Sequence, residues 1–261
     1  MNWKPPYVGN AFISEGILLP ETRLIIFGAF GSWKSVLSIY TTFSLANGAP
    51  WFGYRTRKST VFKYQAELPK YMDKERIENY ARASNSYPDN VFFKTVDDRA
   101  KLDTSWGLQS FAKDIEEVKL RSPDTPLIVL LDPLYTMMAG HISDEYDVKK
   151  FQDNMNTTIA KYHITVIIVH HPRKSKMEEG QTVDMGGEEI MGSSYWMNWC
   201  DTMLRCKVTN PYAGADVVEY RWEKTRNAKK FLKPFTVRWN RDTLQPTVEV
   251  EELSVRNIKE E

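Results

Sequence analysis

Short apolar runs alternate with longer segments of helical periodicity along the first two thirds of the chain. The runs predict strands at residues 23–27, 60–65, 91–95, 127–131 and 164–169, and the segments between them predict helices at about 34–46, 69–84, 106–120 and 148–162. Strands and helices that alternate in this way are typical of a mostly parallel sheet flanked by crossover helices. The pattern therefore predicts an α/β fold.

The pattern changes after residue 171. Residues 173–192 are rich in Lys, Glu and Gly with little periodicity, which predicts a long loop. Alternating or β-branched runs follow at 202–208, 217–222, 235–239 and 247–250, and we expect them to extend the same sheet as antiparallel strands. We interpret residues 21–251 as one large domain, preceded by an N-terminal extension (1–20) and followed by a polar tail (252–261).

Composition and charge narrow the class of protein. The 261 residues include 35 Lys and Arg against 34 Asp and Glu, so a surface that binds nucleic acid would have to be a local patch. Cys200 and Cys206 form no CxxC motif, which argues against a zinc site or a disulfide framework. No run approaches the roughly 18 apolar residues of a membrane span. We therefore expect a soluble cytoplasmic protein with no membrane partner.

The strongest local motif is Gly28-Ala-Phe-Gly-Ser-Trp-Lys-Ser35, which lies between a predicted strand and a predicted helix. In that context glycines let backbone N–H groups turn toward phosphates, Lys34 can reach β- and γ-phosphate oxygens, and Ser35 can ligate Mg²⁺. The alternative is an ordinary glycine-containing turn with a solvated lysine. We predict an ATP site that includes Gly28, Phe30, Gly31, Ser32, Trp33, Lys34, Ser35 and Val36.

Trp33 departs from the usual phosphate-loop pattern, because it stands where a second glycine is expected. A side chain is tolerated there if the residue keeps a negative φ and its indole points away from the phosphates. We expect that geometry. Trp33 in place of glycine also leaves room for slow turnover or an altered nucleotide fit.

Two carboxylates are predicted at the same edge of the sheet as the phosphate loop. Asp132 ends a buried strand, and ligands of open α/β sheets sit at the carboxyl ends of the strands. Asp132 could therefore hold Mg²⁺ opposite Ser35, or simply cap the turn that follows. Glu67 follows another strand and could orient or deprotonate an attacking water, or complement the dipole of the next helix.

His170 and His171 follow the predicted strand at 164–169. Adjacent side chains on an extended chain point to opposite sides, so the two imidazoles make a poor metal pair. One of them is expected to bind the γ-phosphate or its water, and the alternative is one buried and one exposed histidine without a ligand.

Taken together, these motifs resemble the RecA-like ATPases, and most closely the branch with the RepA-type and DnaB-type hexameric helicases. The resemblance covers residues 18 to 251 and rests on the order of its elements along the chain. These are the loop ending Lys34-Ser35, Gln65-Ala-Glu-Leu-Pro69, Leu131-Asp-Pro-Leu134, His170-His-Pro172, Gly192-Ser-Ser194, Trp199-Cys-Asp-Thr202 and Lys224-Thr-Arg-Asn227.

The resemblance implies a role for each matching residue. Glu67 would be the catalytic base, Asp132 would serve the metal, and His170 would be the sensor of the γ-phosphate. Arg226 would be an arginine finger and Lys224 its companion, both directed at the nucleotide of a neighbouring subunit, so hydrolysis would require a hexameric ring or a filament. The alternative for Lys224 and Arg226 is solvated charge between strands.

The resemblance also implies contact with single-stranded DNA through the segments 134–147 and 173–192. Arg173, Lys174 and Lys176 are the candidate phosphate contacts, although acidic residues in the same segment also fit a merely solvated loop. We expect an ATP- and Mg²⁺-dependent motor on single-stranded DNA, such as a plasmid- or phage-type replicative helicase. The alternatives are a recombinase-like or annealing-assisting ATPase, and a nucleotide-binding regulator with no DNA role.

Overall fold

The computed structural model describes residues 10–95, 101–171, 177–178, 181–182, 194–209 and 216–249. Its strands are β1 (Arg23–Gly28), β2 (Thr60–Gln65), β3 (Val91–Thr95), β4 (Leu127–Asp132), β5 (Thr165–His170), β6 (Met177–Glu178), β7 (Gln181–Thr182), β8 (Thr202–Val208), β9 (Val217–Thr225), β10 (Phe235–Trp239) and β11 (Pro246–Glu249). Its helices are α1 (Lys34–Asn47), α2 (Lys70–Ser84), α3 (Ser105–Arg121), α4 (Glu145–Tyr162) and α5 (Ser194–Trp199), with a 3-10 turn η1 (Leu134–Met137).

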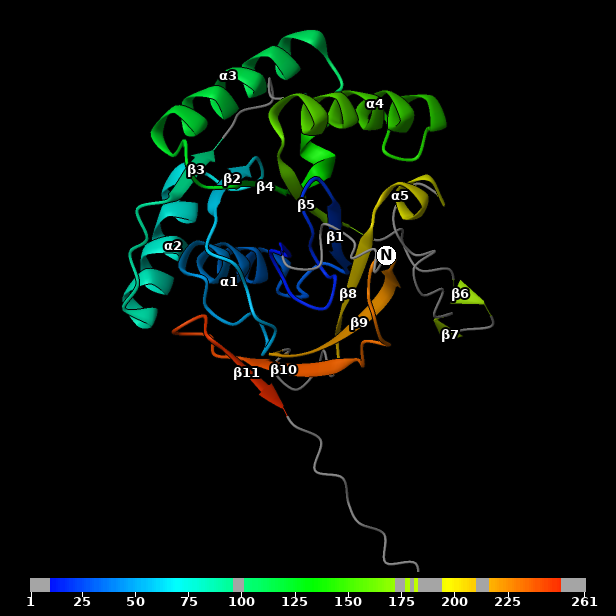
Figure 1. The fold of residues 1–261 in the computed structure, drawn as a ribbon. Coiled ribbons are helices and arrows are strands. Elements are labelled where there is room, and N and C mark those ends of the chain that lie inside the picture. Colours follow the sequence, from blue (N-terminus) through cyan, green and yellow to red (C-terminus); the bar gives the residue numbers. More distant parts are fainter. Residues whose placement is uncertain are drawn as a thin grey trace, which may run out of the picture.

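A nine-stranded sheet in the order β11-β10-β9-β8-β1-β5-β4-β2-β3 forms the centre of the molecule (Figure 1). The strands from β8 to β3 run parallel, and β9, β10 and β11 extend the sheet as an antiparallel meander. The predicted fold class, a mostly parallel sheet with antiparallel strands toward the C-terminus, is confirmed.

One strand differs from its expected direction. The first run after the long loop was expected to be antiparallel, but β8 pairs parallel with β1. The segment that joins β5 to β8 contains α5 and is long enough for the crossover that a parallel strand requires. The connections from β8 to β9, from β9 to β10 and from β10 to β11 are shorter, so these strands pair antiparallel.

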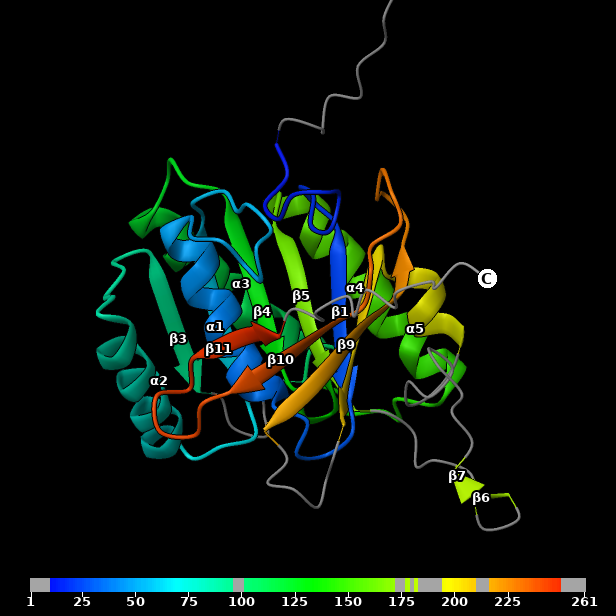
Figure 2. The same ribbon diagram turned by 90° about the horizontal axis from the view of Figure 1, so that it is seen from below.

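Hydrophobic clusters cover both faces of the sheet. On one face the strands pack against α3 and α4 through residues such as Phe111 and Phe151. On the other face they pack against α1, and the meander end of the sheet curls beside this helix (Figure 2). The first helix ends as predicted, because Gly48 has the left-handed φ of 69° that a C-terminal cap requires.

Part of the expected N-terminal extension belongs to the hydrophobic core. Phe12, Ile13, Ile17 and Leu18 are buried in the cluster that contains α1. The domain boundaries at residues 20 and 251 otherwise stay predictions.

No helix among the described residues is both long and apolar enough to cross a membrane.

Candidate functional site

A cavity of about 360 Å³ opens where β1, β2, β4 and β5 end, on the same side of the sheet as the start of α1. It is lined by residues 30–36 of the predicted phosphate loop, by Glu67, Asp132 and His171, and by several apolar side chains. Its volume lies within the range of small-molecule sites, and the carboxyl edge of a parallel sheet is the usual place for a ligand. The fold thus brings together motifs that are up to 140 residues apart.

The phosphate loop is shaped by close contacts. A Cβ atom on Gly28 would lie 2.3 Å from the carbonyl oxygen of Cys206 on β8, so only glycine fits there. Gly31 has a φ of +78°, a backbone conformation that glycine adopts without strain. The loop ends at the first turn of α1, whose free N–H groups and positive dipole favour an anion.

Lys34 is almost completely buried at the start of α1. Its ammonium donates hydrogen bonds to the carbonyl oxygen of Ala29 at 2.7 Å and to Ser32 Oγ at 3.2 Å. Burial lowers the pKa of Lys34 from its usual value, while the nearby Asp132 and Glu67 carboxylates act in the opposite direction. The phosphate loop therefore wraps around Lys34 and holds the charged ammonium group beside the cavity.

Trp33 does not have the expected backbone conformation. Its φ is +62° and its ψ is 15°, so this tryptophan adopts the left-handed conformation that the glycine of the usual pattern would adopt. The indole stacks on Trp239 of β10, with ring centroids 5.9 Å apart and an interplanar angle of 6°. The expectation of a negative φ was therefore wrong. A left-handed tryptophan carries a backbone strain of about 1–2 kcal/mol, and stacking of its indole on Trp239 offsets this strain.

This geometry gives two Trp33 variants different stabilities. Both Trp33→Ala and Trp33→Gly lose the stacked ring, but only the glycine variant relieves the left-handed backbone. We expect both to melt below the unmodified protein, and Trp33→Gly to be more stable than Trp33→Ala by about 1 kcal/mol. Thermal unfolding measures the difference, and equal melting temperatures for the two variants would contradict this account of Trp33.

Asp132 and Ser35 supply oxygen donors at one end of the cavity. Both side chains line it, and Asp132 Oδ2 accepts a hydrogen bond of 2.7 Å from Ser38 Oγ, one turn further along α1. A hydroxyl and a carboxylate are donors that Mg²⁺ accepts when phosphate oxygens and water complete its shell. Within the described residues no group of three or more His, Cys, Asp and Glu side chains could hold a metal without such help. The residues therefore fit Mg²⁺ bound together with a nucleotide.

Glu67 lies on the turn between β2 and α2. The Gln65 side chain forms this turn, because its Oε1 accepts hydrogen bonds from the backbone N–H groups of Glu67 and Leu68. The Glu67 carboxylate is exposed toward the cavity and accepts a hydrogen bond of 3.2 Å from the Tyr135 hydroxyl. The predicted base is thus held by a neighbour from η1 that the sequence did not single out.

The two histidines point to opposite sides, as expected for an extended chain, and His170, the predicted sensor, does not line the cavity. His170 is fully buried, and its ring packs edge-on against Trp196 of α5. His171 lines the cavity and lies between Phe30 and Tyr135, at centroid distances of 6.4 and 5.2 Å. The structure thus places His171 and not His170 at the cavity, because the alternation along β5 turns residue 170 into the core. Contact of either histidine with a γ-phosphate stays a prediction.

Burial of His170 predicts a pH dependence of stability. Desolvation lowers its pKa from 6.5 to about 4, so the folded protein keeps this imidazole neutral while the unfolded chain takes up a proton below pH 6.5. This contribution to the free energy of unfolding is complete above pH 6.5 and is lost as the pH falls toward 4. Its order of magnitude is about 3 kcal/mol.

Chemical denaturation of His170→Gln and the unmodified protein across this pH range measures the contribution. We expect the variant to show a flatter pH profile, whereas His141→Gln, which changes an exposed histidine, should follow the unmodified protein. Parallel profiles for His170→Gln and the unmodified protein would refute the buried neutral histidine.

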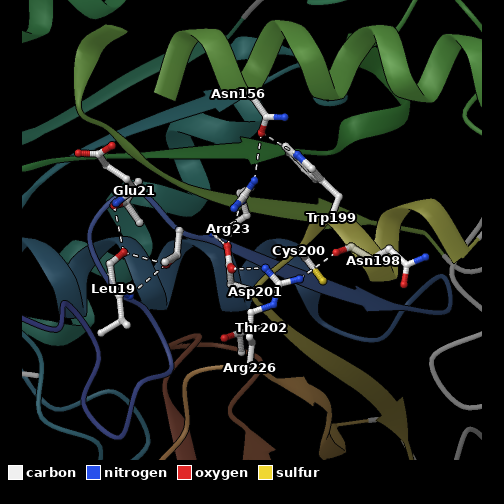
Figure 3. Close-up of polar contacts among 12 residues, drawn as sticks. Leu19, Glu21, Arg23, Asn156, Asn198, Trp199, Cys200, Asp201, Thr202 and Arg226 are labelled. Carbon is white, nitrogen blue, oxygen red and sulfur yellow. Dashed lines mark hydrogen bonds and ion pairs between the residues drawn. The ribbon is translucent and has the colours of Figure 1, made fainter. Parts of the chain in front are cut away.

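Arg226 follows β9 and lies beside the start of β1, at the edge of the sheet opposite the phosphate loop. Figure 3 shows its side chain next to Asp201. Its guanidinium pairs with Asp201 Oδ1 at 3.0 Å and donates to the carbonyl oxygen of Asn198. Asp201 also binds Arg23, the first residue of β1. At about 3.3 Å per residue, the start of β1 lies about 17 Å from the loop that follows its end. Arg226 therefore cannot reach the phosphate loop of its own chain.

Lys224 is engaged at the same edge. Its ammonium donates to the carbonyl oxygens of Met197, Asn198 and Cys200 at the C-terminal end of α5. A cation there satisfies free carbonyl groups and complements the helix dipole. Lys224 therefore stabilises the end of α5 within its own chain. Its contact with the nucleotide of a neighbouring subunit stays a prediction.

The candidate DNA contacts Arg173, Lys174 and Lys176 lie outside the described residues. In the other candidate segment, 134–147, the structure describes η1, a short connection and the start of α4.

Besides Ser38, three polar residues near the site were not predicted from the sequence. Tyr135 follows Asp132 by three positions, and Arg76 lines the cavity from α2. Lys63 is buried within β2 and lies 3.6 Å from Asp132. The sequence offered one signal for this group, a lysine between the aromatic residues Phe62 and Tyr64 of a predicted strand.

Comparisons with known proteins agree with the geometry. A family model described as an AAA domain matches residues 6–177. The comparison with curated proteins found no match. Among solved structures, the chain is similar to a DnaB-like replicative helicase whose structure was described together with its interactions with primase. The TM-score is 0.64 at 10% sequence identity, and the match covers 86% of this chain and 57% of the helicase chain.

At this identity the likeness shows the fold, and the matched region spans little more than half the length of the helicase. The likeness confirms the predicted RecA-like fold, and the match to the AAA domain family agrees with it.

Proposed function

Because the chain belongs to the AAA domain family, we propose that it is an ATP-hydrolysing, oligomeric motor that acts on single-stranded DNA. Within this class we propose a replicative helicase of the plasmid or phage type. The observation that carries the proposal is the cavity itself, where a phosphate loop, two metal donors, a carboxylate base and a histidine meet at the edge of a helicase-like sheet.

The residues that line the cavity have different roles in the transfer of the γ-phosphoryl group to water. The loop N–H groups and Lys34 bind the β- and γ-phosphates and stabilise the charge that develops on them. Glu67 orients the attacking water and accepts its proton while the bond between the γ-phosphorus and the bridging oxygen of ADP breaks. His171 lies where it can contact the γ-phosphate, and its ring touches Tyr135, the residue that holds Glu67.

Ser35 and Asp132 are the residues that would hold Mg²⁺ in this site. The ion would supply positive charge that offsets the charge of the β- and γ-phosphate oxygens. Asp132 is already oriented for this role by the Ser38 hydroxyl.

In the proposed assembly, Arg226 of a neighbouring subunit supplies the remaining positive charge at the site. Since Arg226 lies far from the phosphate loop of its own chain, it would act on the nucleotide of a neighbouring subunit, with Lys224 beside it. Half of the Arg226 side chain is exposed, so a partner can approach it. A ring or filament would then place one subunit's cations against the next subunit's cavity.

An unwinding assay with a forked DNA duplex tests the proposed function together with electron microscopy of the assembly. Closed rings and ATP-dependent strand separation are expected of a helicase. Open filaments without unwinding would favour the recombinase-like alternative, and no binding of single-stranded DNA at low salt would favour a nucleotide-binding regulator.

A further inference from the structure

A buried lysine next to the proposed metal site has no part in the mechanism described so far. Lys63, in the middle of β2, is only 1% exposed. Its ammonium lies 3.3 Å from Asp73 Oδ1 on α2 and 3.6 Å from Asp132 Oδ2 on β4. Both carboxylates are buried as well. Charges are retained in a protein interior only when they are paired, so one lysine balances two aspartates here.

The Asp132 carboxylate does not need Lys63 for its orientation. Ser38 donates a 2.7 Å hydrogen bond to the same oxygen, Oδ2, from the second turn of α1. The lysine is further away, and its contact is one of charge more than of hydrogen-bond geometry. What Lys63 adds to Asp132 is therefore a positive charge held at a fixed distance.

We propose that Lys63 is the internal counter-ion of Asp132 and that it weakens the affinity of this carboxylate for Mg²⁺. The inference rests on the proposed function, because it takes Asp132 as a metal ligand. A fixed cation repels a divalent ion held by the same carboxylate, and the repulsion is strong where water is excluded. Lys63 thus keeps the site from holding Mg²⁺ tightly, so that the metal can leave with the spent nucleotide.

The second partner of Lys63 determines how the inference can be tested. Replacing Lys63 alone would leave the buried Asp73 carboxylate without a counter-ion, at a cost of several kcal/mol. The double variant Lys63→Met/Asp73→Asn avoids this for Asp73, because methionine matches the length of the lysine chain and asparagine removes the second charge. Asp132 is then the one carboxylate of the pair of aspartates that lacks the lysine charge. Asp73→Asn alone keeps the pair between Lys63 and Asp132 and is the reference for the double variant.

The experiment follows the binding of a fluorescent, non-hydrolysable ATP analogue as a function of Mg²⁺ concentration, so it does not depend on turnover. The Mg²⁺ midpoint of the double variant should fall at least about fivefold below that of Asp73→Asn. Lys74→Met, which removes an exposed lysine from α2, controls for the change in net charge and should leave the midpoint within about twofold of the unmodified protein. Thermal unfolding establishes that each variant is folded.

Equal midpoints for the double variant and Asp73→Asn would overturn the inference, and so would a raised midpoint, which would mean that Lys63 orients the metal carboxylate. If the methionine variant does not fold, Lys63→Gln/Asp73→Asn offers a neutral amide that can hydrogen-bond, and the same fall is expected. If analogue binding by the unmodified protein is independent of Mg²⁺, the proposed metal site fails and the inference fails with it. The unmodified protein thus distinguishes the two failures.

Discussion

Lys34→Ala is expected to abolish ATP hydrolysis, with a loss of roughly 10²–10³-fold or more. Lys34 is the cation that the folded phosphate loop holds through the Ala29 carbonyl and the Ser32 hydroxyl, and it lines the cavity with Asp132 and Glu67. Its removal takes away charge that stabilises the phosphates and, more strongly, the transition state. Steady-state release of phosphate measures the loss.

Two controls show whether a loss of hydrolysis comes from the phosphate loop and not from a general loss of charge or from unfolding. Lys149→Ala removes an exposed lysine from α4, away from the cavity, and should hydrolyse ATP like the unmodified protein. Because Lys34 is buried, the melting temperature of Lys34→Ala must show that the variant is folded. Unchanged turnover in a folded Lys34→Ala protein would falsify the assignment of the phosphate loop.

Arg226→Ala is expected to bind ATP nearly as well as the unmodified protein and to lose hydrolysis by about 10³-fold or more, the range seen for arginine fingers. The reason is its position, since Asp201 holds Arg226 at the edge of the sheet remote from the phosphate loop of the same chain. Arg238→Ala, which removes a half-exposed arginine from β10, is the matched control and should keep its activity.

Mixing two inactive variants tests whether Arg226 acts across a subunit boundary. An Arg226→Ala subunit keeps Glu67, and a Glu67→Ala subunit keeps Arg226, so a mixed assembly contains some complete sites. We expect partial recovery of hydrolysis when the two are mixed. Absence of recovery in assemblies shown to contain both variants would argue against an arginine that acts on its neighbour.

Periodicity was enough to predict most of the fold. The strands of the parallel sheet are short apolar runs and the helices between them are longer amphipathic segments, so both kinds of element could be located within a few residues. The direction of β8 could not be predicted in this way, because it depends on the crossover through α5 rather than on the strand's own residues. The six-residue helix α5 was also too short for a periodic signal.

The candidate site could be predicted where the position of a motif at the end of a strand fixes its place in the fold. The loop from Phe30 to Val36, Asp132 and Glu67 line one cavity, as their positions at strand ends indicated. The choice between His170 and His171 depended on which face of β5 turns toward α5, and the left-handed Trp33 depended on a ring 206 positions away. Pairs such as Arg226 with Asp201 and Lys63 with Asp73 arise from packing, so sequence spacing alone could not reveal them.

Steady-state ATP hydrolysis with and without single-stranded DNA shows whether the protein is a DNA-dependent ATPase. The measurement is made at low and moderate salt with Lys34→Ala as the blank, because contacts to DNA phosphates weaken as salt rises. We expect turnover to rise sharply with DNA at low salt and Lys34→Ala to abolish it. Turnover that is indifferent to DNA, or absent despite bound nucleotide, would argue against a DNA-dependent ATPase.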